Sequence, residues 1–560
     1  MNIIKKIVLL NIFFFFLIIT YSQTSNQHYW VEFTDKNTTS FSIDHPQVYL
    51  SQRAIDRRMK QHISINQSDL PINTSYLTGI SKKGAVVINQ SKWLNAVVAS
   101  IGQENVSAIR SLPYVKKITL LNSTKNCELP SKFETFESIT NTSGTRAMDV
   151  VNATTGVAFN YGSSFNQVNQ IGVDCMHSLG FTGKGLVIAQ LDAGFYKVNS
   201  IAAFARIRNN HQILGTRDVV TGGISVYEDD THGMAVLSTM AGYIDGSLIG
   251  TAPDAKFWLI RTEDAATEYI EEEVFWTIGA EFADSVGADI INSSLGYSRF
   301  DNSSTNHTYA DMDGNTTIIT KAADLAASKG ILVVSSAGNS AGSPWYKITA
   351  PADADSVLTV GAIDATGIIA GFSSRGLTYD GRIKPDVCAK GSNTTFASAG
   401  GGIAFGGGTS FSSPITAGAV ACLWQANPTK TNMELIDVIK KSADRYISPD
   451  SIYGYGIPNY CYANDLLNGV ISIDELQNMQ IYPNPFINYL QISFYATKNE
   501  NIIIELIDVT GKKIRSQENE MLAYSQNLFV IDESTNLSAG MYFIQVKTSD
   551  KTIVKKIIKN

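Results

Sequence analysis

Between residues 186 and 361 the chain alternates short apolar runs with longer stretches of helical pattern. The apolar runs predict buried strands near 186–191, 256–261, 288–293, 331–336 and 356–361. The intervening helices are predicted near 232–243, 271–286 and 316–329. This alternation indicates an α/β fold, a doubly wound parallel sheet with helices on both faces, whose site lies at the carboxyl ends of the strands.

Strand patterns also occur on both sides of this region. Before it, strands are predicted at 84–88, 93–99 and 114–120 with a helix over 103–112, a βαβ-like order. After about residue 470, short alternating strands separated by turn signals predict a β-sandwich of about eighty residues. A chain of 560 residues with 44% hydrophobic content is expected to hold several such domains.

The N-terminus has the pattern of a secretory signal. Lys5 and Lys6 precede an apolar run from Ile7 to Thr20. As a helix that run spans about 21 Å, which is short of a bilayer core of about 30 Å. We therefore expect residues 1–23 to be a signal peptide that is removed, rather than a membrane anchor, and no transmembrane segment in the mature chain.

Net charge and cysteine content exclude few classes of function. The net charge of −7 gives no electrostatic reason to expect nucleic acid as a partner. Export would permit disulfides, but the five cysteines are odd in number and show no framework. We expect most of them to be small buried hydrophobic residues, and their pairing is left open.

Two acidic segments need an interpretation. The stretch Glu263–Glu273 is most simply a solvated helix face. Asp301, Asp311 and Asp313 could bind Ca²⁺ through hard oxygen ligands, but their segment lacks a clear loop signature. An ordinary polar surface loop is the favoured interpretation, and the metal site stays unknown.

The segment Gly408–Pro414 delivers Ser410 to the start of a helix predicted over 411–424. Proline is tolerated in a first helical turn, where its missing N–H would have no partner. Free backbone N–H groups and the helix dipole favour negative charge at this point. These are the requirements of a serine nucleophile, although Ser410 alone would more simply be an N-cap.

Three further polar residues stand at strand or helix ends. Asp192 follows the strand 186–191, His232 begins a small-residue helix, and Asn339 follows the strand 331–336. Taken singly, they could be a strand-end cap, a surface helix residue and a turn former. Together with Ser410 they give the order Asp, His, Asn, Ser along the chain. If each residue had only its separate structural role, this order would be a coincidence of four residues.

These blocks resemble those of the subtilisin-type serine peptidases (S8 family), over roughly residues 160–470. The resemblance implies a triad in which Ser410 attacks the scissile carbonyl, His232 takes its proton and Asp192 orients the imidazole. Asn339 would donate to the oxyanion. Peptide hydrolysis through an acyl-enzyme needs no cofactor, and the family's frequent structural calcium keeps such an ion possible.

Five residues near the predicted triad depart from the family pattern, among them Ala193 in place of Ser or Thr and Ser412 in place of alanine. Met234 and Ala235 stand where Thr and His usually follow His-Gly, and Phe411 replaces the usual methionine. None removes a catalytic atom, but Met234 and Phe411 are expected to change the packing beneath the site.

Substrate binding is assigned by the same resemblance. Ser294, Leu295 and Gly296 resemble the family's edge segment that pairs with an extended peptide, and Ala337 and Gly338 would form the opposite wall. Ordinary strand ends and turns are the alternative. No charged residue marks the primary pocket, so we expect a preference for apolar or aromatic side chains.

The flanking modules also resemble known parts of exported peptidases. Residues 24–125 resemble the inhibitor-like α+β propeptide that assists folding and then blocks the cleft, with a permanently retained accessory domain as the alternative. Residues 126–158, rich in Ser, Thr and Asn, are expected to form a linker with the processing site, followed by the peptidase domain at 159–470.

The last module, residues 478–560, resembles the C-terminal sorting domain of type IX secretion in Bacteroidetes. The resemblance rests on the opening Tyr482–Phe486, the strand Gly540–Phe543 and the terminal lysines. A generic carbohydrate-binding or adhesive sandwich is the alternative. Sorting would make the type IX secretion machinery a partner and would place the protein at the cell surface or outside the cell.

The predicted function is therefore a secreted, self-processing serine endopeptidase that acts on proteins or peptides. The alternative is a surface binding or adhesion protein on a catalytically weak peptidase scaffold, since a fold does not guarantee its activity. Met234, Ala235 and Phe411 leave room for that alternative.

Overall fold

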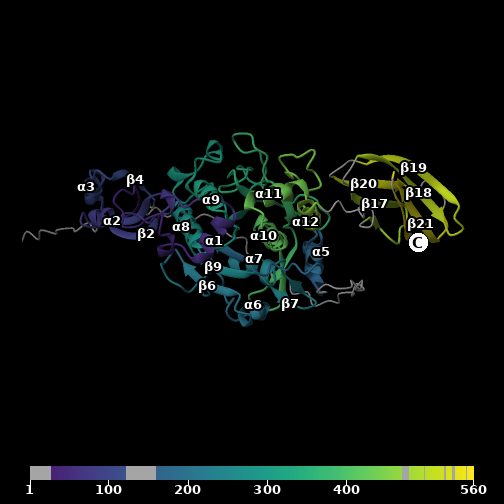
Figure 1. Cartoon of the computed structure of the whole chain (residues 1–560), viewed down its shortest axis with the longest axis horizontal. Helices are drawn as coiled ribbons and strands as arrows, with labels where there is room; N and C mark the ends of the chain where they lie inside the picture. Colours follow the sequence, from purple (N-terminus) through teal and green to yellow (C-terminus); the bar gives the residue numbers. More distant parts are fainter. Residues whose placement is uncertain are drawn as a thin grey trace, which may run out of the picture.

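A computed structural model of the protein describes residues 27–121, 159–469, 479–496, 499–521, 525–532, 537–549 and 551–560. These residues form three units in chain order (Figure 1). The predicted signal peptide, 1–23, and the predicted linker, 126–158, lie outside the described residues.

The N-terminal unit is a four-stranded antiparallel sheet in the order β2-β3-β1-β4. Because β1 lies between β3 and β4, the predicted βαβ unit is present but split. The elements are β1 (Gln27–Phe33), α1 (Gln52–Lys60), α2 (Thr74–Ser81), β2 (Val86–Ser91), β3 (Ala96–Ile101), α3 (Val106–Arg110) and β4 (Val115–Leu120). The pattern did not predict α1, because this helix buries Arg57 and Arg58 together with only one small apolar residue, Ala54.

The central unit contains the predicted parallel sheet, in the order β13-β12-β11-β10-β5-β9-β6. Its strands are β5 (Val187–Asp192), β6 (Ile213–Asp218), β9 (Lys256–Arg261), β10 (Ile290–Ser293), β11 (Leu332–Ser336), β12 (Val357–Ile363) and β13 (Val387–Lys390). The strand order reverses at β5, which has β9 on one side and β10 on the other. Such a reversal opens a crevice at the carboxyl ends of the strands.

Helices cover both faces of this sheet, as predicted. One apolar core joins the sheet to α7 and α10, and a second core joins its other face to α8 and α9. The helices of the unit are α4 (Phe165–Asn169), α5 (Val173–Ser178), α6 (Ala205–Asn209), α7 (His232–Ala241), α8 (Glu271–Val286), α9 (Ile318–Ser328), α10 (Thr409–Ala426), α11 (Asn432–Lys441) and α12 (Tyr460–Asn468). Two short antiparallel pairs, β7–β8 (Tyr243–Ile244, Leu248–Ile249) and β14–β15 (Thr394–Ala397, Ile403–Gly406), complete it.

The acidic stretch before and within α8 is not the solvated face that we predicted. The three glutamates that open α8, Glu271–Glu273, are at most 4% exposed. Glu273 accepts a hydrogen bond from the backbone N–H of Ile318 (3.1 Å), at the start of α9, and Glu271 lies 2.8 Å from Nδ1 of His28 in β1. The prediction was wrong because these partners are remote in sequence, and a buried charge is tolerated only where such partners exist.

The C-terminal unit confirms the predicted β-sandwich. Its two antiparallel sheets have the orders β16-β17-β20 and β19-β18-β21-β22 and share one apolar core. The strands are β16 (Gln480–Tyr482), β17 (Tyr489–Ala496), β18 (Glu500–Asp508), β19 (Lys513–Met521), β20 (Ser525–Asp532), β21 (Gly540–Lys547) and β22 (Thr552–Lys559). Within the described parts of the chain, no helix is long and apolar enough to cross a membrane.

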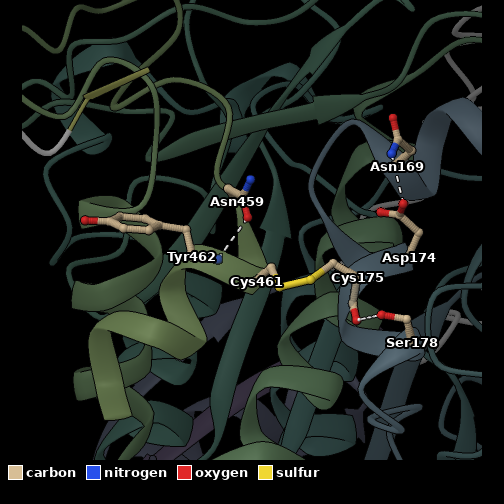
Figure 2. The surroundings of a disulfide bond; sticks show 7 residues. All are labelled: Asn169, Asp174, Cys175, Ser178, Asn459, Cys461 and Tyr462. Carbon is tan, nitrogen blue, oxygen red and sulfur yellow. Dashed lines mark hydrogen bonds between the residues drawn. A yellow bond between two sulfur atoms is a disulfide. The ribbon is translucent and has the colours of Figure 1, made fainter. Parts of the chain in front are cut away.

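A disulfide joins the two ends of the central unit. Cys175 of α5 is bonded to Cys461 of α12, which lies 286 residues further along the chain (Figure 2). Cys388 and Cys422 are free and buried, as expected for small hydrophobic residues, whereas the disulfide-bonded Cys175 and Cys461 depart from that expectation. Cys127 lies outside the described residues. The disulfide therefore connects the first part of the peptidase unit to the helix that precedes the sandwich.

Candidate active site

The carboxylate of Asp192 and the imidazole of His232 meet at the strand-order reversal. Asp192 is the last residue of β5 and His232 the first of α7. His232 Nδ1 lies 2.7 Å from Asp192 Oδ1, and both side chains are buried. A Cβ atom on Gly233 would lie 2.3 Å from the carbonyl oxygen of Gly194 and 2.9 Å from Asp192 Cβ. The glycine after the histidine therefore lets α7 begin directly against the strand end.

Two residues that the sequence analysis missed hold this pair. The amide of Gln190 donates to Asp192 Oδ2 (3.2 Å) and to the carbonyl of Gly233 (2.9 Å). Asp230 Oδ1 accepts the backbone N–H of His232 at 2.7 Å. The signal for Gln190 was a polar residue inside an otherwise apolar strand, and the signal for Asp230 was an acidic residue just before a helix start.

Three carboxylates favour the protonated form of His232. Burial is the largest influence and lowers the pKa of His232, but Asp192, Asp230 and Glu263 together raise that pKa above its ordinary value. Glu263 is fully buried and lies two residues beyond Arg261, the β9 register partner of Asp192. The register therefore brings a carboxylate that we had expected in solvent to the edge of the sheet where Asp192 and His232 meet.

Ser410 lies in the first turn of α10 and is 7% exposed. Gly408, which precedes this turn, has a φ of 148°. A Cβ atom at Gly408 would lie 2.7 Å from Ser410 Oγ and 3.5 Å from Asn339 Nδ2. Both polar atoms therefore border the same small space, which only a glycine leaves open.

The helix begins earlier than predicted, and this changes the role of Pro414. Because α10 starts at Thr409, Pro414 lies beyond the first turn, where its N–H would have bonded to the carbonyl of Ser410. The hydroxyl of Ser294 donates to that carbonyl instead, at 2.9 Å. Proline thus leaves the carbonyl of Ser410 without a donor from the helix, and Ser294, the residue that follows β10, supplies one.

Asn339 is oriented by Thr409. Asn339 Oδ1 accepts both the backbone N–H and the hydroxyl of Thr409, at 2.9 Å each. The Thr409 hydroxyl in turn accepts the N–H of Gly338 at 3.2 Å. With its oxygen engaged by Thr409, the amide directs Nδ2 towards the space beside Ser410. Thr409 was also missed, although its place immediately before the serine could have drawn attention to it.

The first turns of α7 and α10 meet in one packed cluster. The ring of Phe411 stacks on Phe396, with 4.9 Å between centroids, and the cluster also contains Ala235 and Ala404. Ala235 and Phe411, both departures from the family pattern, therefore pack together, three residues after His232 and one residue after Ser410. A small side chain on α7 accompanies a large one on α10.

The two predicted walls for a substrate lie side by side, since the Ser336 hydroxyl reaches the carbonyl of Leu295 at 3.4 Å. Leu295 and Ala337 are buried, whereas Gly296 is exposed. Ser294 and Gly338 already use polar groups within the protein, on Ser410 and Thr409 respectively. Pairing of these segments with a peptide stays a prediction.

The carboxylates of the acidic loop considered for calcium accept hydrogen bonds within the protein. Asp301 accepts the N–H of Glu268 (3.1 Å), Asp311 the N–H of Thr308 (2.6 Å) and Asp313 the N–H of Asn315 (2.8 Å). Among the residues that the structure describes, no group of three or more His, Cys, Asp or Glu side chains could hold a metal ion. Structural calcium stays a prediction without assigned ligands.

Three family models match the chain, one in each of the three units of the structure. Residues 183–456 match the subtilase family, residues 28–135 the peptidase S8 propeptide domain of Bacteroidota, and residues 480–560 the secretion system C-terminal sorting domain.

Several curated peptidases are similar to this chain. Subtilisin E of Bacillus subtilis (strain 168) is 27% identical over 388 residues, which cover 68% of this chain and 83% of that protein. Subtilisin of Bacillus pumilus is 30% identical over 299 residues, 52% of this chain and 95% of that protein. Serine protease AprX of Bacillus subtilis is 30% identical over 310 residues, 50% and 66% of the two chains.

Proposed function

Because the chain belongs to the subtilase family and is a serine endopeptidase, we propose that it cleaves peptide bonds with Asp192, His232 and Ser410. The observation that carries this assignment is the 2.7 Å contact between His232 Nδ1 and Asp192 Oδ1. With Nδ1 occupied by the carboxylate, Nε2 is the nitrogen that can take a proton from a hydroxyl.

The reaction follows from these roles. Ser410 Oγ attacks the scissile carbonyl while His232 Nε2 takes its proton, and Asp192 stabilises the imidazolium that forms. His232 then gives the proton to the leaving amine, which leaves an acyl-enzyme on Ser410. A water molecule, deprotonated by the same imidazole, releases the acid product.

Asn339 is proposed to stabilise the oxyanion together with the backbone N–H of Ser410. Support comes from the orientation of its amide, which Thr409 fixes through Oδ1, and from the place of Nδ2 beside Ser410. A preset donor does not have to reorganise when negative charge develops, and loss of such a donor costs about 10²–10³ in turnover, a range that comes from subtilisin itself.

The enzyme is proposed to be a self-processed zymogen. The match of residues 28–135 to an S8 propeptide domain supports this, as does the packing of the N-terminal unit on α8. Cleavage within 126–158 would separate that unit from the peptidase. The C-terminal sorting domain indicates export by type IX secretion, to the cell surface or the medium. Acceptance of apolar or aromatic substrate side chains remains part of the proposal.

The test is the intact mass of purified wild type and Ser410→Ala, before and after a serine-reactive fluorophosphonate. We expect a labelled wild type that has lost its N-terminal unit, and a full-length variant without label. A folded, processed wild type that takes no label would contradict the catalytic proposal and favour the binding-protein alternative. Normal processing of Ser410→Ala would show that another peptidase makes the cut.

A further inference from the structure

The segment Ser51–Gln61, which we call the arm, lies against the C-terminal ends of α8 and α9. It consists of α1 and one residue on either side. The C-terminal end of α8 leads into Asp289, whose backbone N–H donates to the carbonyl of Val187, the first residue of β5. The arm is therefore at the amino ends of the parallel strands, at the edge of the sheet opposite Asp192.

The arm satisfies backbone carbonyls that both helices leave open. The last carbonyls of a helix have no partner within it and need donors from elsewhere. The arm supplies five such donors to residues in or just after α8 and α9: Ser51 N–H to Ser285 (2.9 Å), Arg53 Nε to Gly287 (2.8 Å), Arg57 Nη1 to Ala288, Arg57 Nε to Lys329 (3.1 Å) and Gln61 Nε2 to Gly330 (2.7 Å).

Two arginines of the arm are buried in an ion cluster with the peptidase unit. Arg57 pairs with Asp284 Oδ1, and Arg58 Nη2 lies 2.9 Å from both Asp284 Oδ2 and Asp69 Oδ1. Lys329 Nζ lies 3.2 Å from Asp69 Oδ1. All five side chains are at most 4% exposed. Charges so deeply buried are stable only together, because removal of one partner leaves another uncompensated.

Glycines at the two helix ends admit the arm. Gly287 and Gly330 both have a φ of +85°. A Cβ atom on Gly287 would lie 2.7 Å from Arg53 Cβ, and one on Gly330 would lie 2.7 Å from Gln61 Nε2. The peptidase surface therefore allows close approach of the arm at these glycines, and Asp284 gives it a negative charge that complements the arginines of the arm.

We propose that the ends of α8 and α9 form an arginine-binding surface, and that the arm on this surface holds the N-terminal unit in place after the chain is cut within 126–158. The inference deepens the zymogen proposal. A cut in the linker changes none of the contacts of the arm, which lie at the edge of the sheet opposite the catalytic residues. Loss of the arm, by a cut within it or by its dissociation, would then weaken the attachment of the N-terminal unit.

The test uses the full chain with Ser410→Ala and with the site of an exogenous, sequence-specific protease placed in 126–158. After the cut, the dissociation constant of the two fragments is measured by size exclusion and titration. We expect the parent fragments to co-elute at about 1 μM, and Arg57→Gln/Arg58→Gln to weaken the complex by about 100-fold or more. Lys60→Gln, an exposed charge on the same helix, should change nothing.

In this design an exogenous protease cuts the chain, so retention of the N-terminal unit is measured without self-cleavage. A negative result for retention is therefore distinct from a negative result for the proposed catalysis. Parent fragments that separate at that concentration, or a double variant that binds as tightly as the parent, would overturn the inference. If the double variant does not fold, Arg53→Gln decides. Its side chain is 41% exposed, so its replacement spares the buried cluster, and its lost contacts predict about tenfold weaker binding. Unchanged binding of Arg53→Gln would then contradict the inference.

Discussion

The hydroxyl of Ser294 donates to the backbone carbonyl of Ser410 at 2.9 Å, in place of the N–H that Pro414 lacks. A strand end on one side of the site and the first turns of α10 are thereby joined at the proposed nucleophile. The arrangement also explains why a proline is accommodated in the body of this helix, where it would otherwise leave a buried carbonyl without a partner.

The Ser294 bond predicts a specific coupling with Pro414. Ser294→Ala should destabilise the protein by about 1–3 kcal/mol, because the buried carbonyl of Ser410 loses its donor. In a Pro414→Ala background the new N–H can bond to that carbonyl, so the same change should cost about 1 kcal/mol less. Urea unfolding of the four variants, made with Ser410→Ala to prevent autolysis, measures the cycle. An equal cost in both backgrounds would show that the two residues are not coupled.

Thr409 is predicted to act through Asn339. Thr409→Val removes the hydroxyl that positions the amide, and we expect kcat to fall about tenfold with little change in KM. Thr409→Ser keeps the hydroxyl and should retain most of the activity. Asn339→Ala should lower kcat by about 10²–10³. Adding Thr409→Val to Asn339→Ala should cost nothing further, and a full additional tenfold loss would rule out action through the amide.

The pH profile should depend on Glu263. His232 must be neutral to act as a base, so kcat/KM should rise with pH through the pKa of this histidine. Burial lowers that pKa, but Asp192, Asp230 and Glu263 raise it, so the acid limb should lie above the ordinary value. Glu263→Gln should move the limb to lower pH. Asp437→Asn, a largely exposed charge on α11, serves as the control. If the acid limb stays in place in Glu263→Gln, Glu263 does not raise the pKa of His232.

Attachment of the N-terminal unit is predicted to weaken as pH rises. Burial raises the pKa of Glu281 to about 7 beneath Ser91 and Lys92, and the hydrogen bond to Glu271 raises the pKa of His28. Both raised values mean that the attached state binds protons more tightly than the separated one. Affinity should therefore fall between about pH 5 and pH 7.5, by at most tenfold per pH unit for each group.

This pH effect can be measured on the cut Ser410→Ala chain. Glu281→Gln keeps the size of the side chain without its titration, and it should flatten the dependence. Lys36, whose pKa burial lowers to about 8, titrates above the range concerned. Tighter binding at pH 7.5 than at pH 5 would contradict the predicted fall of affinity with rising pH.

The disulfide should stabilise the peptidase unit strongly, because it closes a loop of 286 residues. Cys175→Ser/Cys461→Ser is expected to lower the free energy of unfolding by about 2–5 kcal/mol. Urea titration with and without reductant is the measurement, again with Ser410→Ala. Reductant should reproduce the loss in the parent and add nothing in the double variant. A parent that is indifferent to reductant would argue that the bridge contributes no stability.

Much of the fold could be predicted because its signals are local. The strands near 256–261 and 331–336 contain continuous apolar runs, Phe257–Ile260 and Ile331–Val334, and burial on both faces needs no knowledge of their partners. The α8 helix was predicted over its observed span, 271–286, and yet its exposure was misjudged. Periodicity predicts that a helix forms. Whether its glutamates are buried depends on His28 and on α9, and the sequence pattern of α8 holds no information about either.

By itself the sequence indicated the alternation of strands and helices in the central unit and the candidate residues for the chemistry. Asp192, His232, Asn339 and Ser410 stand at strand and helix ends because the parallel sheet collects such positions at one edge. Only the tertiary structure decided which polar groups are buried, as with Arg58 and Glu263, and which partners satisfy them, as with Ser294 on Ser410. The physical reason is that burial of a polar group is stable only with a partner in space, and that partner is rarely near in sequence.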